Sequence, residues 1–394
     1  MRHVRVLSMA ALAVLAIVAV GCGGDDNNNA SKSGGGGQVT GVRAGTGSRQ
    51  HEAAEAGTKA AEASGGKVDL PEKRAGILQI LGAIESTQRV ENTVTEAIKS
   101  VGRTTTVCDA QGDPKKMAAC GDSLLDRNVD VMFVIGIEPS LIKGQLRKAQ
   151  QQNVPAVEIN GQVTADPLWS GTYYPDEEKA GRILADSLMK KMQEVEGIAD
   201  LGVADYPATW ASARTDQLKQ AVKDSGGKAK IAATSVTDAT NLVQGTQKTV
   251  TDQLTQNPDL KGYWFAFDSA GQAGGPAIQA KSGGKMFPDK PWVVTFHADL
   301  GTLDLMRKGA IDVVLDVPYD AAGWVAVDQA AEFFGRRKAF DKSPDPDYGG
   351  FEIYDYALVT KDNLPPKGQY RTPKNDFVTF FKTKWQHEFG TAGQ

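Results

Sequence analysis

The chain has 394 residues, and at roughly 100–200 residues per domain this length predicts two or three folded units. Hydrophobic residues make up 41% and charged residues 23%, which are the proportions of a globular protein. They exclude a disordered chain, a polytopic membrane protein and a small disulfide-stapled protein. The formal net charge of −4 gives no electrostatic reason to expect nucleic acid as a partner.

Residues 1–21 are typical of a secretory signal peptide. Arg2 and Arg5 precede an apolar run over 7–20, which is shorter than the about 20 residues that a membrane-spanning helix needs. The run ends in AVGC (19–22), and small residues before a single cysteine resemble the lipobox of bacterial lipoproteins. We therefore expect Cys22 to be lipidated and to anchor the mature chain on the extracytoplasmic face of the cell membrane, at the periplasm or the cell surface. The alternative is a plain signal peptide with an incidental cysteine.

Two cysteines remain in the mature chain, Cys108 and Cys120. A single remaining pair in an exported protein predicts a disulfide. A structural zinc site needs more ligands at closer spacing, and the chain has only four histidines. We expect neither a metal nor a cofactor.

Residues 22–67 are predicted to be the lipidated cysteine followed by a flexible spacer. They consist mainly of glycine, asparagine, serine and alanine, with almost no large apolar side chain. Such a segment cannot bury enough surface to offset its ordering entropy. Its Ala/Glu-rich part, 51–63, is expected to form at most a transient helix.

After residue 67, short apolar runs alternate with amphipathic helical patterns. Strands are predicted at 76–81, 104–108, 129–135 and 155–159, with helices at 86–101, 115–127 and 141–152 between them. A helix over 176–196, N-capped by Asp176, precedes a second series of strands, at 199–204, 230–234, 262–267, 292–296 and 311–317. The helices of that series are predicted at 212–223, 246–256, 274–282, 302–308 and 321–334. Strict alternation predicts right-handed crossovers and parallel sheets covered on both faces.

The predicted fold is therefore α/β, with two doubly wound parallel-sheet lobes. The N-terminal lobe with the hinge crossings is assigned to 68–174 plus 318–364, and the C-terminal lobe to 175–317. A tail over 365–394 carries a final helix at 376–389.

Five stretches, in this order, resemble type I periplasmic solute-binding proteins, in particular the monosaccharide- or ribose-binding subgroup of ABC importers. They are RNVDVMFVIGIEPS (127–140), AQQQNVPAVEING (149–161), LKGYWFAFDSAGQAGGPAIQAKSGG (260–284), PWVVTFHADLGTLDLMRKGAIDVVLDVPYDAAGW (291–324) and ALVTKDNLP (357–365). The resemblance covers roughly 74–363 and implies a three-segment hinge, a ligand between the lobes and an ABC permease in the membrane as partner. Two positions depart from the family pattern. His297 replaces the usual Asp after one strand, and Asp316 or Val317 replaces the usual Gln before the hinge proline.

Ligands of open α/β sheets bind at the carboxyl ends of the strands, so the loops there supply the candidate site. The ligand-binding candidates are Glu85, Ser86, Asp109, Glu138, Asn160, Tyr174, Trp210, Arg214, Asp268, His297 and Asp316. Carboxylates, amides and a guanidinium pair well with hydroxyls, and aromatic rings pack against the apolar faces of a sugar. The mixture predicts a sugar-like ligand.

Several candidates also have structural alternatives. Arg214 matches a family position where arginine commonly binds sugar oxygens, but a surface ion pair is the alternative. Asp268 can instead cap the helix predicted at 274. His297 can be a satisfied core residue, and Asn160 can simply form its Asn-Gly turn.

The leading hypothesis is a monomeric extracytoplasmic solute-binding lipoprotein of an ABC importer. An enzyme is disfavoured because the chain has no G-x-S-x-G elbow, phosphate-binding loop or H-E-x-x-H motif. A transcriptional regulator of similar fold is disfavoured by the signal peptide. Two alternatives stay open: a protein of this fold that presents its ligand to a membrane receptor, and one that binds a small molecule other than a sugar.

Overall fold

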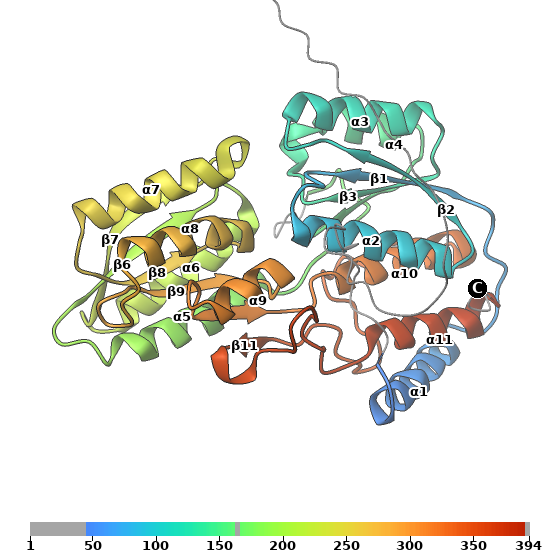
Figure 1. Cartoon of the computed structure of the whole chain (residues 1–394). Helices are drawn as coiled ribbons and strands as arrows, with labels where there is room; N and C mark the ends of the chain where they lie inside the picture. Colours follow the sequence, from blue (N-terminus) through green and yellow to red (C-terminus); the bar gives the residue numbers. More distant parts are fainter. Residues whose placement is uncertain (1–44, 162–165, 391–394) are drawn as a thin grey trace, which may run out of the picture. The chain divides into compact units, whose positions relative to one another are not determined.

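The structure is a computed structural model that describes residues 45–161 and 166–390. The predicted signal peptide and Cys22 lie outside these ranges. Two sheets, one in each lobe, organise the described chain (Figure 1). Among the described helices, none is long and apolar enough to span a membrane.

Five parallel strands form the sheet of the N-terminal lobe, in the spatial order β2-β1-β3-β4-β5. Its elements are β1 (Arg74–Gln79), α2 (Glu85–Ser100), β2 (Thr104–Asp109), α3 (Pro114–Asp126), β3 (Val131–Ile135), η1 (Pro139–Leu141), α4 (Lys143–Gln151), β4 (Ala156–Ile159) and β5 (Gly171–Tyr173). On one face Ile77 and Phe133 pack with α2 and with α10 (Ala321–Arg336), and on the other Leu78 and Met132 pack with α3 and α4. Because helices cover both faces, the central strands are continuous apolar runs.

Six strands form the sheet of the C-terminal lobe, in the order β11-β10-β9-β8-β6-β7, with only β11 antiparallel. Its elements are α5 (Glu177–Met192), β6 (Ala199–Asp205), α6 (Thr209–Asp224), β7 (Ala229–Val236), η2 (Ala239–Asn241), α7 (Leu242–Gln256), β8 (Leu260–Phe265), α8 (Asp268–Lys281), β9 (Trp292–Phe296), α9 (Leu300–Arg307), β10 (Val313–Asp316), β11 (Ala357–Val359) and η3 (Lys361–Asn363). The α/β prediction of two lobes with parallel sheets is confirmed.

Helix α8 begins six residues before its predicted start. The glycines of this segment serve close packing inside the helix. A Cβ on Gly271 would lie 2.8 Å from Thr295 Oγ1, and one on Gly274 would lie 2.3 Å from the Phe265 ring. Only glycine lets the helix approach the sheet this closely.

The described chain passes between the lobes four times. The expected three crossings follow β5, β10 and Tyr354, and the tail adds a fourth between η3 and the final helix α11 (Phe377–Phe389). The predicted range 318–364 for the N-terminal lobe therefore needs correction, because β11 within it pairs with β10 in the second sheet. Helix α11 returns to the N-terminal lobe and packs in its core.

The predicted spacer is also shorter than expected, because residues 48–63 form a packed helix, α1 (Ser48–Ala63), beside α11 (Figure 1). Ala53, Gly57 and Ala61 recur every four residues and are its buried positions. A Cβ on Gly57 would lie 2.5 Å from the backbone oxygen of Phe380. Low hydrophobicity suggested a flexible segment, whereas the small residues form one flat stripe for close helix packing.

A buried ion cluster fixes α11 against α10. The ammonium of Lys384 lies 2.7 Å from Asp328, 3.1 Å from Glu332 and 2.8 Å from Glu388, and all four side chains are buried. The three carboxylates are close enough to hold a metal ion, but the lysine ammonium already lies among them. A hollow of about 640 Å³ between α1, α10 and residues 338–351 borders the cluster.

Replacing Lys384 with Met is expected to lower the free energy of unfolding by about 3–5 kcal/mol, because three buried carboxylates lose their counter-charge. The matched control is Lys382→Met, two residues along the same helix. Lys382 is exposed and pairs with Glu96 at the surface, so its loss should cost at most about 1 kcal/mol. Urea unfolding of both variants measures the difference, and equal losses would contradict this account of the cluster.

Candidate functional site

Two predicted site residues of the N-terminal lobe make hydrogen bonds to groups outside their own sheet, one at the hinge and one in the facing lobe. From the N-terminal lobe, Asn160 follows β4 and donates to the backbone oxygen of Tyr319 at 2.8 Å. Glu138 follows β3 and accepts from the backbone N–H of Thr209 at 3.1 Å. Both residues lie at the carboxyl ends of strands, where the general rule for open α/β sheets predicts a ligand site.

Arg214 forms a buried ion pair. Its Nε and Nη2 donate to the two carboxylate oxygens of Glu177 at 2.6 and 2.8 Å, and its Nη1 donates to the oxygen of Ala266 at 3.0 Å. The guanidinium also packs over the rings of Trp210 and Phe296. The weighed alternative to ligand contact was an ion pair at the surface, whereas this ion pair is internal, with Arg214 only 2% exposed.

Arg214 also determines which nitrogen of His297 carries the proton. Its Nη2 lies 3.2 Å from Nε2 of His297, and because arginine can only donate, Nε2 must accept. The neutral ring therefore carries its proton on Nδ1, which lies 3.6 Å from the Asp268 carboxylate. Burial, with the nearby Arg214 charge, lowers the pKa of His297 to about 4, so the ring is neutral at pH 7.

Asp268 and His297 owe their positions to the ends of adjacent strands. Asp268 is the first residue of α8 rather than its N-cap, which is Phe267. His297 directly follows β9 with a left-handed backbone (φ 59°), and its ring packs 4.1 Å from that of Tyr319. Both side chains are buried.

An ion pair between the lobes, absent from the sequence prediction, lies beside this pair. Arg89 of α2 donates to Asp299 at 2.7 Å and to Asp320 at 3.3 Å, and the rings of Tyr319 and Tyr370 flank its guanidinium. Burial raises the pKa of the Asp299 carboxyl, and the charge of Arg89 opposes that rise.

Arg89 and Asp299 could have been found from the sequence, because each lies close to a predicted site residue. Arg89 follows Glu85 by one helical turn, and Asp299 follows His297 by two residues. Tyr370 lies in the tail and gave no such signal.

Glu85 and Asp316 are engaged with backbone groups around the same region. Glu85 accepts from the N–H groups of Leu300 and Gly301 at 2.7 and 3.1 Å and from the Tyr370 hydroxyl at 3.0 Å. Asp316 accepts from the N–H of Ala298 at 2.8 Å and from Arg371 at 2.5 Å. Both carboxylates thus organise the loops after β9 and β10.

The remaining candidates differ in their surroundings. Ser86 is buried in the first turn of α2. Trp210 is half-buried and forms an aromatic cluster with Tyr206 and Phe267. Tyr174 is half-buried, and burial near Glu158 raises the pKa of its hydroxyl to about 12.

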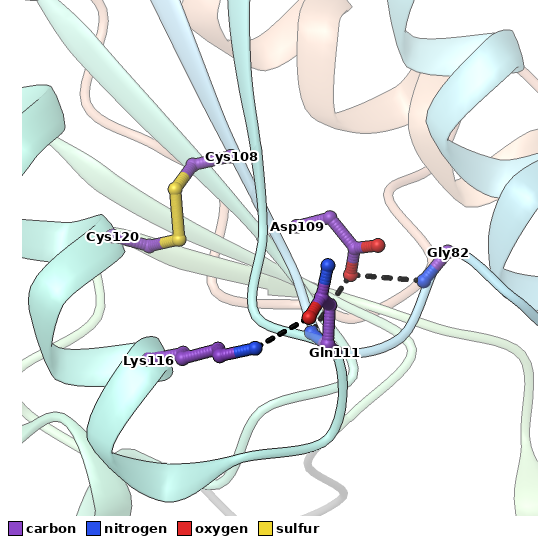
Figure 2. Close-up of a disulfide and its surroundings, with 6 residues drawn as sticks. All are labelled: Gly82, Cys108, Asp109, Gln111, Lys116 and Cys120. Carbon is purple, nitrogen blue, oxygen red and sulfur yellow. Dashed lines mark hydrogen bonds between the residues drawn. A yellow bond between two sulfur atoms is a disulfide. The ribbon is translucent and has the colours of Figure 1, made fainter. Parts of the chain in front are cut away.

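The disulfide predicted between Cys108 and Cys120 is present and ties the end of β2 to α3 (Figure 2). The next residue, Asp109, is exposed and accepts from the N–H groups of Gly82 and Gln111 at 3.0 and 2.9 Å. Gly82 belongs to the loop that leads to Glu85. The disulfide therefore lies next to the hydrogen bonds that join the end of β2 to this loop.

Among the buried side-chain atoms that make no hydrogen bond with any part of the described chain, six belong to residues at the ends of β1, β4 and β9 or to the ion pair between α2 and α9. They belong to both lobes, and they are Nε2 and Oε1 of Gln79, Nε of Arg89, Oδ1 of Asn160, Nδ1 of His297 and Oδ2 of Asp299. Buried polar groups in native proteins are nearly always paired, so each of these atoms needs an explanation. A polar ligand would supply the partners.

Comparison with known proteins identifies the fold. Residues 82–337 match the periplasmic binding protein domain. A search of curated proteins found no match. Among solved structures, the protein is similar to a carbohydrate transporter solute-binding protein from Agrobacterium radiobacter in complex with D-arabinose, at 21% identity and a TM-score of 0.61, covering 75% of this chain and 96% of that one.

Two further solved structures are similar to this chain over about the same share of its length. One is a solute-binding protein of an ABC transporter from Agrobacterium vitis with bound allitol, at 19% identity and a TM-score of 0.64, covering 75% of this chain and 98% of that one. The other is the Caulobacter myo-inositol binding protein, at 14% identity and a TM-score of 0.64, covering 74% and 94%. At these identities, the likeness extends to the fold alone.

The low pKa of His297 predicts an acid-sensitive contribution to stability. Between about pH 6.5 and 4 the unfolded chain binds a proton on this residue that the folded chain does not, so stability falls as the pH is lowered through this window. The contribution is about 3 kcal/mol. His297→Asn keeps a residue that tolerates the left-handed backbone and removes the titration. Urea unfolding at pH 7 and 4.5 should therefore show a smaller loss in the variant than in the wild type, and parallel losses would contradict the assignment.

Removal of the disulfide by Cys108→Ser with Cys120→Ser is expected to lower the free energy of unfolding by about 3 kcal/mol, the chain-entropy value for a loop of this length. Denaturant unfolding of the double variant measures the loss. The oxidised and reduced wild-type protein should differ by the same amount. A loss below about 1 kcal/mol would show that the bond does not constrain this loop.

Proposed function

The chain belongs to the periplasmic binding protein family, and we propose that it captures a small polyhydroxylated ligand, a sugar or polyol, between its two lobes. In this proposal the lobes close on the ligand by motion at the hinge, and the protein passes the ligand to an ABC permease. The observation that carries the proposal is the set of six buried polar atoms without protein partners.

The chemistry of these atoms favours hydroxyl groups. Three are donors, namely Nε2 of Gln79, Nε of Arg89 and the protonated Nδ1 of His297. Three are acceptors, namely Oε1 of Gln79, Oδ1 of Asn160 and Oδ2 of Asp299. An anionic ligand would use only the donors and a cationic ligand only the acceptors. A hydroxyl both donates and accepts, so a polyhydroxylated molecule suits a balanced set.

The aromatic residues add an apolar surface suited to a sugar ring. Trp210 is half-buried beside Arg214, and Tyr319 lies against His297. Solved structures of this fold carry D-arabinose, allitol or myo-inositol, and each is a small neutral polyhydroxylated molecule. These ligands are therefore the first probes to test.

The proposal includes the cellular setting predicted from the sequence. Lipidation at Cys22 would hold a monomeric protein on the extracytoplasmic face of the membrane. No catalytic step is proposed. The ligand is expected to leave the protein chemically unchanged, which mass analysis after prolonged incubation can check.

A thermal-shift screen with D-arabinose, allitol, myo-inositol and related sugars tests the proposal. At least one compound should raise the melting temperature, because a ligand that binds only the folded state stabilises it by mass action. Amino acids, nucleosides and small aromatic acids form the comparison set. Stabilisation only by members of that set would overturn the polyhydroxylated class.

Substitution of Gln79 tests the site itself. Gln79→Leu removes two polar atoms that lack protein partners, so it should leave the melting temperature of the ligand-free protein equal or higher while abolishing the shift. Thr93→Val is the matched control. Thr93 is also buried, and its hydroxyl makes no hydrogen bond within the described chain, but it lies in the middle of α2, against α10. Its replacement should leave ligand binding unchanged.

A further inference from the structure

We propose that Glu85 and Glu138 form a latch between the lobes. Each carboxylate belongs to the N-terminal lobe, caps the N-terminus of a helix in the C-terminal lobe and thereby stabilises the closed arrangement without contacting the ligand. The inference rests on the proposed function, in which the lobes close on a ligand. It assigns to these two residues a positioning role in place of the ligand contact predicted from the sequence.

Glu138 caps helix α6. The N-cap residue of α6 is Ala208, which has no side chain able to accept a hydrogen bond from the first turn. Oε1 of Glu138 accepts from both the backbone N–H and the hydroxyl of Thr209, at 3.1 and 3.0 Å. The first N–H groups of a helix have no acceptors within the helix, so an acceptor from outside the helix stabilises its N-terminus. Here the cap comes from the facing lobe.

Glu85 caps helix α9 in the same way. The N-cap residue there is Asp299, but its carboxylate makes no capping bond, and its Oδ1 accepts from Arg89 and from the Tyr319 hydroxyl at 2.7 and 2.8 Å. The two oxygens of Glu85 accept instead from the N–H groups of Leu300 and Gly301. The N-terminus of α9 is thus capped by the carboxylate of Glu85 from the other lobe and not by that of its own N-cap residue, Asp299.

Helix polarity strengthens the second cap. Glu85 is the first residue of α2, so its carboxylate lies at the N-termini of α2 and α9 together. Both termini carry partial positive charge, and they face each other across this one side chain. Without the negative charge, the two helix ends would repel and oppose closure. Arg89, one turn further along α2, adds the ion pair with Asp299 and keeps the same two helices in register.

The latch can be tested without a ligand, by measuring the distance between the lobes. Spin labels at Lys115→Cys on α3 and Lys248→Cys on α7, both exposed, report this distance by double electron–electron resonance. A Cys22→Ser background leaves these as the only free thiols, because Cys108 and Cys120 are joined. Glu138→Gln should raise the ratio of open to closed molecules by roughly fivefold, the effect of losing one helix cap, and Glu85→Gln by at least as much. The double variant should show the combined shift.

The control is Glu178→Gln. Glu178 is an exposed glutamate in the first turn of α5 and should leave the distance distribution unchanged. A distribution that neither Glu138→Gln nor the double variant alters overturns the latch, as does a wild-type protein that is already fully open without ligand. Because no ligand enters the experiment, failure of the sugar screen leaves this result intact. Conversely, ligand binding with an unchanged distribution removes only the latch.

Discussion

Two helix N-termini from different lobes share one carboxylate, and the arrangement of the candidate site depends on that contact. Glu85 lies at the start of α2 and accepts from the first N–H groups of α9. This frees Asp299, the natural cap of α9, to pair with Arg89. Oδ2 of Asp299 and Nε of Arg89 make no hydrogen bond within the described chain. In the proposed function, these two atoms are available to a ligand because Glu85 caps α9.

The other candidate residues also fall into two groups, those whose polar atoms bond to protein groups and those with a buried polar atom that is unpaired among the described residues. Arg214 and Asp316 direct their polar atoms at protein groups and hold the loops after β8, β9 and β10 in position. Gln79, Asn160 and His297 each keep a buried polar atom that makes no hydrogen bond within the described chain. In the proposed function, hydrogen-bond satisfaction separates the residues that support the site from those that bind the ligand, although both kinds have the same side-chain chemistry.

Sequence reasoning reached the fold because parallel sheets covered on both faces leave a strong pattern of short apolar runs between helices. It also placed Asn160 and His297 correctly at strand ends. It predicted Glu85 and Glu138 as ligand contacts, because a carboxylate after a strand looks the same in the sequence whether it meets a hydroxyl or a helix N-terminus of the facing lobe. Gln79 was not among the predicted site residues, because it ends a strand and appears in the sequence as part of the sheet.

The two ends of the described chain were harder to predict for a different physical reason. The small residues of α1 and the polar segment after η3 gain their structure only from partners far away in sequence. Gly57 fits against α11, and Arg371 pairs with both Asp316 and Asp355. Neither segment falls within residues 82–337, which match the family domain. Yet Tyr370 donates to Glu85 and packs on Arg89, so this tail contacts both of the residues that join α2 to α9.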